Sequence, residues 1–303
     1  MTKEKINFSS HFIKANIFSI ALITISVFVI FFKGLNYGID FKGGTLIEIR
    51  VQNTDINTSQ IRTALKNMNL GDINVKKFGN NLDYLIKIEA TENQNSELIP
   101  VLKKTISKSL QSDVNFRRVE NVGPKVSREL FKSGITAILL SLAAMLFYIW
   151  IRFEWQFSVG SIVALFHDVI ITIGIFSILS FEVNLSIIAA VLTIVGYSMN
   201  DTVVIYDRIR ENLSKYNKIS IDDIANISVN ETLSRTLITS VTTLLALFSI
   251  YILGGEILKG FSFAMILGVI IGTYSSIFVA SPILKYFKVT YKTLEKKDEK
   301  IVP

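Results

Sequence analysis

Six long apolar runs alternate with polar segments along the chain, and this pattern divides it into membrane-spanning helices and one polar domain. Each run has roughly the 17 to 25 residues that a helix needs to cross about 30 Å of hydrocarbon. The pattern therefore predicts a polytopic α-helical membrane protein with six transmembrane helices, one at 16–33 and five within 134–284. The five later runs are residues 134–151, 157–180, 185–206, 236–253 and 261–284.

The long polar segment at 34–133 has the pattern of a small α+β domain. Apolar residues alternate with polar ones near its middle and form stripes in two helical stretches, the second with Ser96 as a candidate N-cap. The order βαββαβ is the ferredoxin-like arrangement, with two helices on one face of a four-stranded antiparallel sheet. A turn is expected at Asn80 and Asn81. The predicted strands are 44–51, 73–78, 82–89 and 113–119, and the predicted helices are 58–68 and 96–110.

The distribution of Lys and Arg predicts the orientation in the membrane. Basic residues gather before the first run, between the fourth and fifth runs and in the tail, whereas the short loops on the other side hold only Lys259. By the positive-inside rule, the N-terminus (1–15) and the basic tail (285–303) are cytoplasmic and the domain at 34–133 is extracytoplasmic. No A-x-A-like site follows the first run, so we expect an uncleaved span rather than a signal peptide.

Composition narrows the function classes. Half of the 303 residues are hydrophobic and the mean hydropathy is +0.45, which is too apolar for a soluble protein of this length. The net charge of +7 is concentrated in the ends and loops, which argues against a nucleic-acid surface. The chain has no cysteine and only two histidines, and it carries no phosphate-loop or zinc motif. We therefore expect no metal, no cofactor and no enzymatic activity.

The strongest candidate for chemistry is Asp201, which lies inside the fourth apolar run between Asn200 and Thr202. An Asp near the centre of a membrane span costs about 2.5 to 3.5 kcal/mol on insertion scales, so such residues usually face a bundle interior, pair with a cation or titrate. Asp201 therefore predicts an ion or proton site in the membrane.

Two further polar groups lie in the apolar runs. His167 and Asp168 are adjacent in the third run, either as a polar relay or as an internal anchor, and neighbouring residues point about 100° apart on a helix. Arg235 begins a hydroxyl-rich stretch at the start of the fifth run. It could extend to water at the membrane edge, or it could pair with Asp201 if the two helices touch.

The segment that joins the first run to the domain is a candidate hinge. Gly38, Gly43 and Gly44 permit backbone angles that other residues resist, and Asp40 lies among them. The alternative is a plain turn between a span and a strand.

Small residues recur every four positions in the last run, at Ala264, Gly268, Gly272, Ser276 and Ala280. Such a ridge lets another helix approach closely. The neighbour could be a helix of the same bundle or a helix of a partner subunit.

Several segments together resemble a known family. The segment G-x-S-x-N-D-T-x-V-x-Y-D-R-I-R-E-N at 196–212 is similar to the fourth-span signature of the SecF branch of the SecD/SecF protein-export family. Four other segments resemble its remaining signatures in the same order, although Lys42 and Tyr206 replace the more common Thr and Phe. They are YGIDFKGGT at 37–45, VGPKV at 122–126, HD at 167–168 and TLSRTLITS at 232–240.

The resemblance implies one half of an export machine of the resistance-nodulation-division type in the bacterial inner membrane. In that family the subunit pairs with SecD beside the SecYEG channel, with SecA, YajC and YidC as associated components. Proton flow is thought to pull preprotein outward after SecA has acted. Carried over by motif, Asp201 corresponds to the carboxylate of the proton path and Arg235 to its basic partner. Half of a proton-coupled small-molecule exporter and a passive membrane scaffold remain alternatives.

Overall fold

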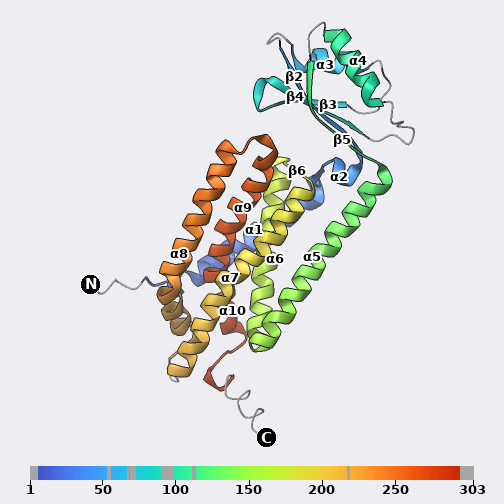
Figure 1. The fold of residues 1–303 in the computed structure, drawn as a ribbon. Coiled ribbons are helices and arrows are strands. Elements are labelled where there is room, and N and C mark those ends of the chain that lie inside the picture. The colour runs from blue at the N-terminus through green and yellow to red at the C-terminus, as the bar shows by residue number, and fades with distance from the viewer. Residues whose placement is uncertain are drawn as a thin grey trace. The chain divides into compact units, whose positions relative to one another are not determined.

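A computed structural model of the chain describes residues 6–52, 56–66, 68, 73–89, 98–110, 114–216 and 219–293. The chain forms two compact units (Figure 1). The helical unit comprises residues 1–35, 137–181 and 186–303, and the outer domain comprises residues 36–136 and 182–185.

Six helices are long and apolar enough to cross a membrane, which confirms the predicted fold class. Three of them extend nine or more residues beyond the apolar runs, because polar residues continue the helix: α5 begins at Pro124, α7 ends at Lys215 and α8 begins at Ile221. The spans are α1 (Phe12–Lys33, preceded by η1, Ser9–His11), α5 (Pro124–Arg152), α6 (Trp155–Leu179), α7 (Leu185–Lys215), α8 (Ile221–Leu253) and α9 (Glu256–Ser275), which continues through η2 (Ser276–Ala280) and α10 (Ser281–Tyr286).

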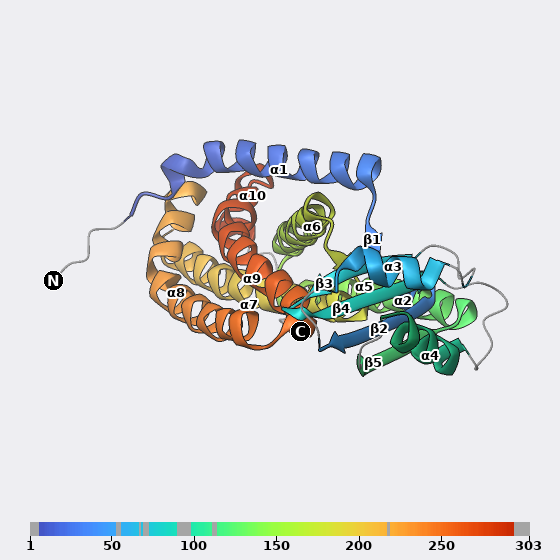
Figure 2. The same cartoon turned by 90° about the horizontal axis from the view of Figure 1, so that it is seen from above.

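Helix α9 has a central place in the helical unit. It packs against α6 and α8, and α1 packs against α6 (Figure 2). The small-residue ridge lies on the face of α9 toward α7, where a side chain at Gly268 would overlap Ile194 and one at Gly272 would lie 3.0 Å from the Cβ of Ser198. The ridge thus serves packing within this chain, the first of the two alternatives that the sequence left open.

The last span is not a continuous α-helix, because a π-helical turn, η2, follows α9. A π-turn is wider than an α-turn and is often found at functional sites. The Ser281 hydroxyl donates to the Ser276 carbonyl at 2.9 Å, and the Tyr206 hydroxyl of α7 donates to the Ala280 carbonyl at 2.9 Å. Gly160 of α6 leaves room for this tyrosine, since a Cβ there would overlap its hydroxyl.

The outer domain is a four-stranded antiparallel sheet with two helices. The strand order β3-β4-β2-β5 is that of the predicted ferredoxin-like arrangement. Alternate residues of the central strands, among them Ile47, Ile49, Tyr84 and Ile86, are fully buried in its core. The elements are β2 (Gly44–Val51), α3 (Thr58–Lys66), β3 (Ile73–Phe78), β4 (Asn80–Glu89), α4 (Leu98–Leu110) and β5 (Val114–Val122).

Some predicted boundaries of the outer domain are wrong. The hairpin turn centres on Gly79, whose φ of 72° is in the left-handed region, and Asn80 already belongs to β4. Helix α3 ends at Lys66 rather than at residue 68, and β5 continues to Val122 instead of ending at 119. The predicted N-cap Ser96 lies outside the described residues.

A second, two-stranded sheet in the outer domain was not predicted. Strand β1 (Asn36–Tyr37) pairs in parallel with β6 (Glu182–Val183), the connection between α6 and α7. The short helix α2 (Ile39–Lys42) follows β1. Two segments far apart in the sequence, 36–38 and 182–183, are therefore joined by backbone hydrogen bonds, among them Gly38 N–H to the Val183 carbonyl at 2.9 Å.

Candidate functional site

Asp168 of α6 is fully buried, and its carboxylate is surrounded by hydrogen-bond donors. One oxygen accepts from the Ser198 hydroxyl of α7 at 2.5 Å and from the Ser275 hydroxyl of α9 at 2.8 Å. The other oxygen lies 2.8 Å from Nδ1 of His167. An ionised carboxylate only accepts hydrogen bonds, so Nδ1 carries the proton when Asp168 is charged. Three helices thus supply a fully hydrogen-bonded site for a buried negative charge. We call Asp168, His167, Ser198 and Ser275 the Asp168 cluster.

His167 is held on its other side by an aromatic ring. Its imidazole stacks on Tyr274 of α9 with ring centroids 6.1 Å apart, and the Tyr274 hydroxyl donates to the Ala15 carbonyl of α1 at 2.8 Å. Although adjacent residues point about 100° apart on a helix, the His167 and Asp168 side chains hydrogen-bond directly. Nε2 of His167 is buried without a hydrogen-bond partner among the described residues.

Asp201 of α7 is 3% exposed, and its surroundings differ from those of Asp168. Its Oδ2 has no hydrogen-bond partner in the described part of the chain. The groups that interact with its carboxylate are the Arg235 guanidinium of α8 and the Thr273 hydroxyl of α9. Thr273 in turn lies 2.8 Å from the Ser240 hydroxyl, which accepts a long bond of 3.4 Å from the Tyr197 hydroxyl. We call Asp201, Arg235, Thr273, Ser240 and Tyr197 the Asp201 cluster.

Arg235 interacts with Asp201 without forming a close ion pair. No ion pair of 4.0 Å or less joins it to an acid among the residues that the structure describes, and its side chain is exposed on the surface of the helical unit. Of the two residues that flank Asp201, Asn200 is exposed and Thr202 is buried. The Asp201 cluster therefore reaches the surface of this chain through Asn200 and Arg235.

Two hydroxyls at the start of the fifth span bond their own helix, as expected for Ser and Thr in apolar helices. Thr239 and Thr242 donate to carbonyls four residues earlier, Arg235 and Ile238. Ser240 is different because it reaches across to α9. Thr236 is also different, since its buried hydroxyl has no partner among the described residues.

The two clusters meet where α7 crosses α9. Ser198 and Asp201 are three residues apart on α7, and Thr273 and Ser275 are two residues apart on α9. Gly272 packs directly against Ser198 at this crossing, so the hydroxyl can reach Asp168. A change in how α7 and α9 pack would therefore alter both carboxylates together.

Sequence reasoning found both carboxylates and missed the hydroxyls that surround them. Ser198, Thr273 and Ser275 are ordinary residues of apolar helices, and only the helix packing shows which carboxylate they contact. A signal was present in the run Thr273-Tyr274-Ser275-Ser276, a cluster of hydroxyls in the middle of the last span.

The predicted hinge residues lie in the outer domain and are held by specific contacts. The Asp40 carboxylate accepts from the backbone N–H of Leu185 at 2.9 Å. Gly38 is required by close packing, because a Cβ would overlap the Glu182 carboxylate. Gly43 and Gly44 have φ of 79° and 137°, which favours glycine. These contacts describe one position of the segment, and its motion stays a prediction.

No group of three or more His, Asp or Glu side chains in the described part of the chain could hold a metal ion. What the helical unit does contain is two buried carboxylates, a histidine and several hydroxyls between membrane-spanning helices. The fold and this site define a multi-pass membrane protein with ionisable groups buried in its helix bundle, a class in which such groups handle ions or protons.

Comparison with known proteins identifies the family. Residues 102–290 match the model described as "Protein export membrane protein SecD/SecF, C-terminal", and residues 28–55 match the SecD/SecF GG motif. The protein translocase subunit SecF of Rickettsia bellii is 46% identical over 271 residues, 89% of each chain. The chain belongs to the SecD/SecF family of protein-export membrane proteins. It is thus a multi-pass inner-membrane protein with a role in protein export.

Solved structures agree with this assignment. The crystal structure of SecDF, a translocon-associated membrane protein from Thermus thermophilus, matches with a TM-score of 0.85 at 34% identity over 94% of this chain. A SecDF structure in a super-membrane-facing form matches with a TM-score of 0.70 over 98%. This chain spans 39% and 41% of those two SecDF chains, respectively.

Proposed function

We propose that this chain is one half of a proton-driven motor that pairs with SecD and promotes preprotein movement through SecYEG after SecA has acted. In this proposal Asp201 binds and releases the proton, Arg235 is its counter-charge, and Asn200 and Thr202 line the path. The Asp168 cluster positions α7 against α6 and α9. The observation that carries the proposal is a buried carboxylate with one unpartnered oxygen beside an exposed arginine.

The physical argument rests on the cost of an incompletely satisfied charge. A buried carboxylate must be hydrogen-bonded, paired with a cation or neutralised by a proton. Burial favours the neutral form of such a group, and a nearby cation favours the charged form. A movement that changes the distance between Asp201 and Arg235 would therefore switch which form is stable, and proton uptake would be tied to that movement.

The available energy is adequate for this role. One proton crossing a potential of 100 mV supplies about 2.3 kcal/mol. That energy can bias a two-state element by about 50-fold. It is too little to unfold a stable domain of about 5 to 15 kcal/mol by itself, so the motor must act on a substrate that another component has already unfolded.

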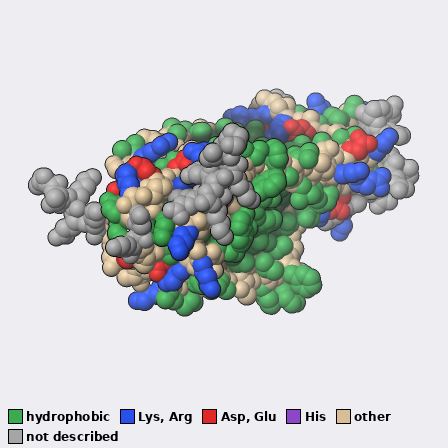
Figure 3. Space-filling model, turned by 90° about the horizontal axis from the view of Figure 1, so that it is seen from below, with side chains coloured by type: hydrophobic (Ala, Val, Ile, Leu, Met, Phe, Trp, Pro, Cys, Tyr) green, Lys and Arg blue, Asp and Glu red, His purple; other side chains and the backbone are tan. Residues whose placement is uncertain are grey.

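Two observations support the proposed motion and orientation. The two SecDF structures share 34% identity with this chain but give TM-scores of 0.85 and 0.70, which supports changes of shape within the family. Lys and Arg side chains gather at the end of the helical unit where α7 ends and α8 begins (Figure 3). This asymmetry supports cytoplasmic termini and an extracytoplasmic outer domain.

The decisive experiment is Asp201→Asn in inverted membrane vesicles with the partner subunits present. Asn preserves size and hydrogen bonding but cannot cycle a proton, so gradient-dependent export should fall to the rate without a gradient, a loss of up to about 50-fold at 100 mV. ATP-driven initiation should persist. Asp207→Asn is the matched control, since Asp207 lies on the same helix but is exposed and paired with Arg152 at 2.9 Å. Full gradient-driven export by Asp201→Asn would leave a passive scaffold as the better explanation.

Arg235→Leu tests the counter-charge in the same assay. Without the cation, the carboxylate should stay protonated through the cycle, and the gradient-dependent stage should again be lost. Arg235→Lys preserves the charge and should retain part of the activity. If Arg235→Leu exported normally, Arg235 would be a residue of the membrane edge, and the site of Asp201 would need another cation.

A further inference from the structure

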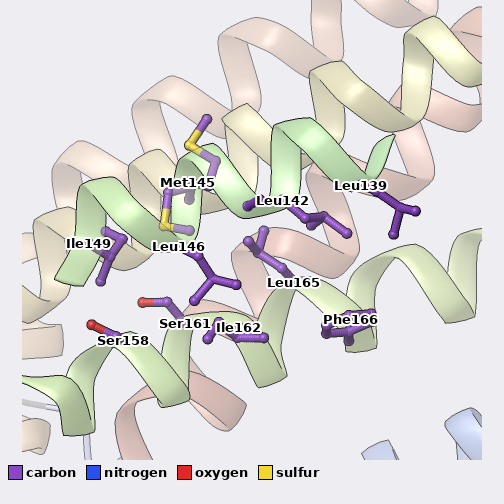
Figure 4. Close-up of a pocket in the computed structure, with 12 residues that line it drawn as sticks. Leu139, Leu142, Met145, Leu146, Ile149, Ser158, Ser161, Ile162, Leu165 and Phe166 are labelled. Carbon is purple, nitrogen blue, oxygen red and sulfur yellow. The ribbon is translucent and has the colours of Figure 1, made fainter. Parts of the chain in front are cut away.

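A cavity of about 190 Å³ lies between α5 and α6 in the helical unit (Figure 4). Its walls are mostly aliphatic: Leu142, Leu146 and Ile149 come from α5, and Leu165 comes from α6. Met199 of α7 closes the inner side. None of these residues belongs to the Asp168 or Asp201 cluster, so the cavity is separate from the proposed proton site.

Two serine hydroxyls line this apolar cavity, and both are buried without a hydrogen-bond partner among the described residues. Ser158 is 5% exposed and Ser161 is 1% exposed. Both come from the α6 side, opposite Met145, Leu146 and Ile149 of α5 (Figure 4).

A serine in an apolar helix ordinarily bonds the carbonyl four residues earlier. Ser228 and Ser262 of this chain do so at 2.8 and 2.7 Å. Ser158 and Ser161 do not. Ser161 also interacts with Tyr206, but the two hydroxyls form no hydrogen bond of standard geometry, and Tyr206 donates to Ala280 instead. Both serines therefore keep a hydrogen-bonding capacity at the cavity wall, and a buried hydroxyl without a partner is costly.

The cavity is closed at the serine end and accessible at the other. Ile149 and Ser158 at the closed end are almost fully buried. Leu139 and Phe166 at the opposite end are 61% and 48% exposed on the apolar surface of the helices. From Leu139 to Ile149 the lining follows α5 for about 15 Å at 1.5 Å per residue. A molecule therefore reaches the hydroxyls from the hydrocarbon layer and with its polar end first.

We propose that this cavity binds a small neutral amphiphile from the bilayer, an alkyl or aryl alcohol of about six to ten heavy atoms. The size follows from the volume, since an apolar cavity of about 150 Å³ accommodates benzene. The apolar lining takes the body of the molecule, and Ser158 and Ser161 hydrogen-bond its hydroxyl. A charged ligand does not fit, because no cation or anion lines the cavity to compensate its desolvation.

The test uses the purified full-length protein in lipid nanodiscs with a diazirine derivative of 1-octanol as photoprobe. Saturable labelling should fall on peptides that contain residues 139–149 and 158–166. The double variant Ser158→Ala/Ser161→Ala should weaken labelling about fivefold, the usual effect of one neutral hydrogen bond. Ser262→Ala, a buried serine that bonds its own helix, should leave it unchanged. Leu146→Phe, or Ile162→Phe if the first variant folds poorly, should block labelling by filling the cavity.

Competition separates recognition of the hydroxyl from unselective filling by lipid chains. 1-Octanol should displace the probe about fivefold better than octane, since only the alcohol can satisfy the serines. Non-saturable labelling spread over all lipid-facing helices would overturn the proposal. So would equal displacement by octanol and octane together with full labelling of the double serine variant, because the occupant would then be any apolar chain.

Discussion

Asp168 and Asp201 are both buried carboxylates in the middle of membrane-spanning helices, and they differ in how their charge is satisfied. Asp168 accepts from two serine hydroxyls at 2.5 and 2.8 Å and contacts His167 at 2.8 Å. Asp201 has an oxygen without a partner among the described residues and a cation that interacts with it from an exposed position. Burial alone therefore does not distinguish an acid that is proposed to bind and release a proton from an acid that holds helices together. The arrangement of hydrogen-bond donors around the carboxylate distinguishes them.

The physical reason is the number of hydrogen bonds that depend on each carboxylate. Three donors converge on Asp168, so loss of this acceptor would leave several buried donors unpaired at once. An incompletely satisfied carboxylate gains less from staying charged, so a small movement of its counter-charge can change its protonation. In the proposed function, Asp168 is therefore the anchor and Asp201 the switch.

The most severe test of this comparison is Asp168→Leu. Leucine has a similar size but leaves the Ser198 and Ser275 hydroxyls and the His167 N–H without their acceptor. We expect a loss of about 3 kcal/mol or more in the free energy of unfolding, as for other buried networks that lose one partner. Thermal unfolding in nanodiscs measures it. Asp201→Asn is the control and should cost clearly less than Asp168→Leu, since it removes an incompletely satisfied charge and keeps a polar side chain in its place. Equal stability of Asp168→Leu and the wild type would reverse the assigned roles.

A smaller effect is expected at the helix crossing that joins the two clusters. Gly268→Ala places a methyl group against Ile194, and Gly272→Ala places one 3.0 Å from Ser198. Overpacking of this kind costs about 1 to 3 kcal/mol. Gly196→Ala is the matched control, because a Cβ there meets nothing within 4 Å. In the same unfolding assay, Gly268→Ala should be the least stable of the three variants. If Gly196→Ala were equally unstable, the glycines would supply helix flexibility and not close packing.

Hydropathy and turn signals predicted the six spans and the order of the outer domain because each span and strand carries its own periodicity. The ends were less predictable. Polar residues continue α5 back to Pro124 and α8 back to Ile221, since a helix outside the apolar layer needs no apolar side chains. The turn was misplaced because Gly79 alone supplies the positive φ, although Asn80 and Asn81 have equally good turn propensity.

The candidate site could be predicted only in part. An Asp in an apolar run is conspicuous, so Asp168 and Asp201 were identified from the sequence. Their difference depends on Ser198, Thr273 and Ser275, which come from other helices and look like ordinary packing residues. The pairing of β1 with β6 was equally invisible, because two-residue strands carry no periodicity. Contacts between distant segments are set by packing and not by local pattern.

A third carboxylate, Asp83 in the outer domain, is also buried, at 4% exposure, but it is fully paired with cations. Its oxygens accept from Nε and a terminal nitrogen of Arg50, both at 2.6 Å, and Arg117 lies 3.4 Å away. The hydrogen bonds from Arg50 are the main cause that lowers the pKa of Asp83 below its ordinary value, with the charge of Arg117 contributing. In contrast to Asp201, this acid has two cations at close range.

The smallest expected effect is the pH dependence of the outer domain, measured on a fragment of residues 38–122 that we expect to fold by itself. Because the folded-state pKa of Asp83 is lowered, its stabilisation is present above the unfolded pKa of about 4 and is lost as the pH falls through the lower folded value. Asp83→Asn should therefore reduce the free energy of unfolding at pH 7 by about 1 kcal/mol, and the difference from wild type should shrink below about pH 4. Glu89→Gln, in a 3.9 Å surface pair with Lys42, should have no measurable effect. Urea unfolding at several pH values measures these free energies. If wild type and Asp83→Asn differed in free energy of unfolding by the same amount at pH 7 and pH 3, Asp83 would stabilise the sheet by packing and not by its charge.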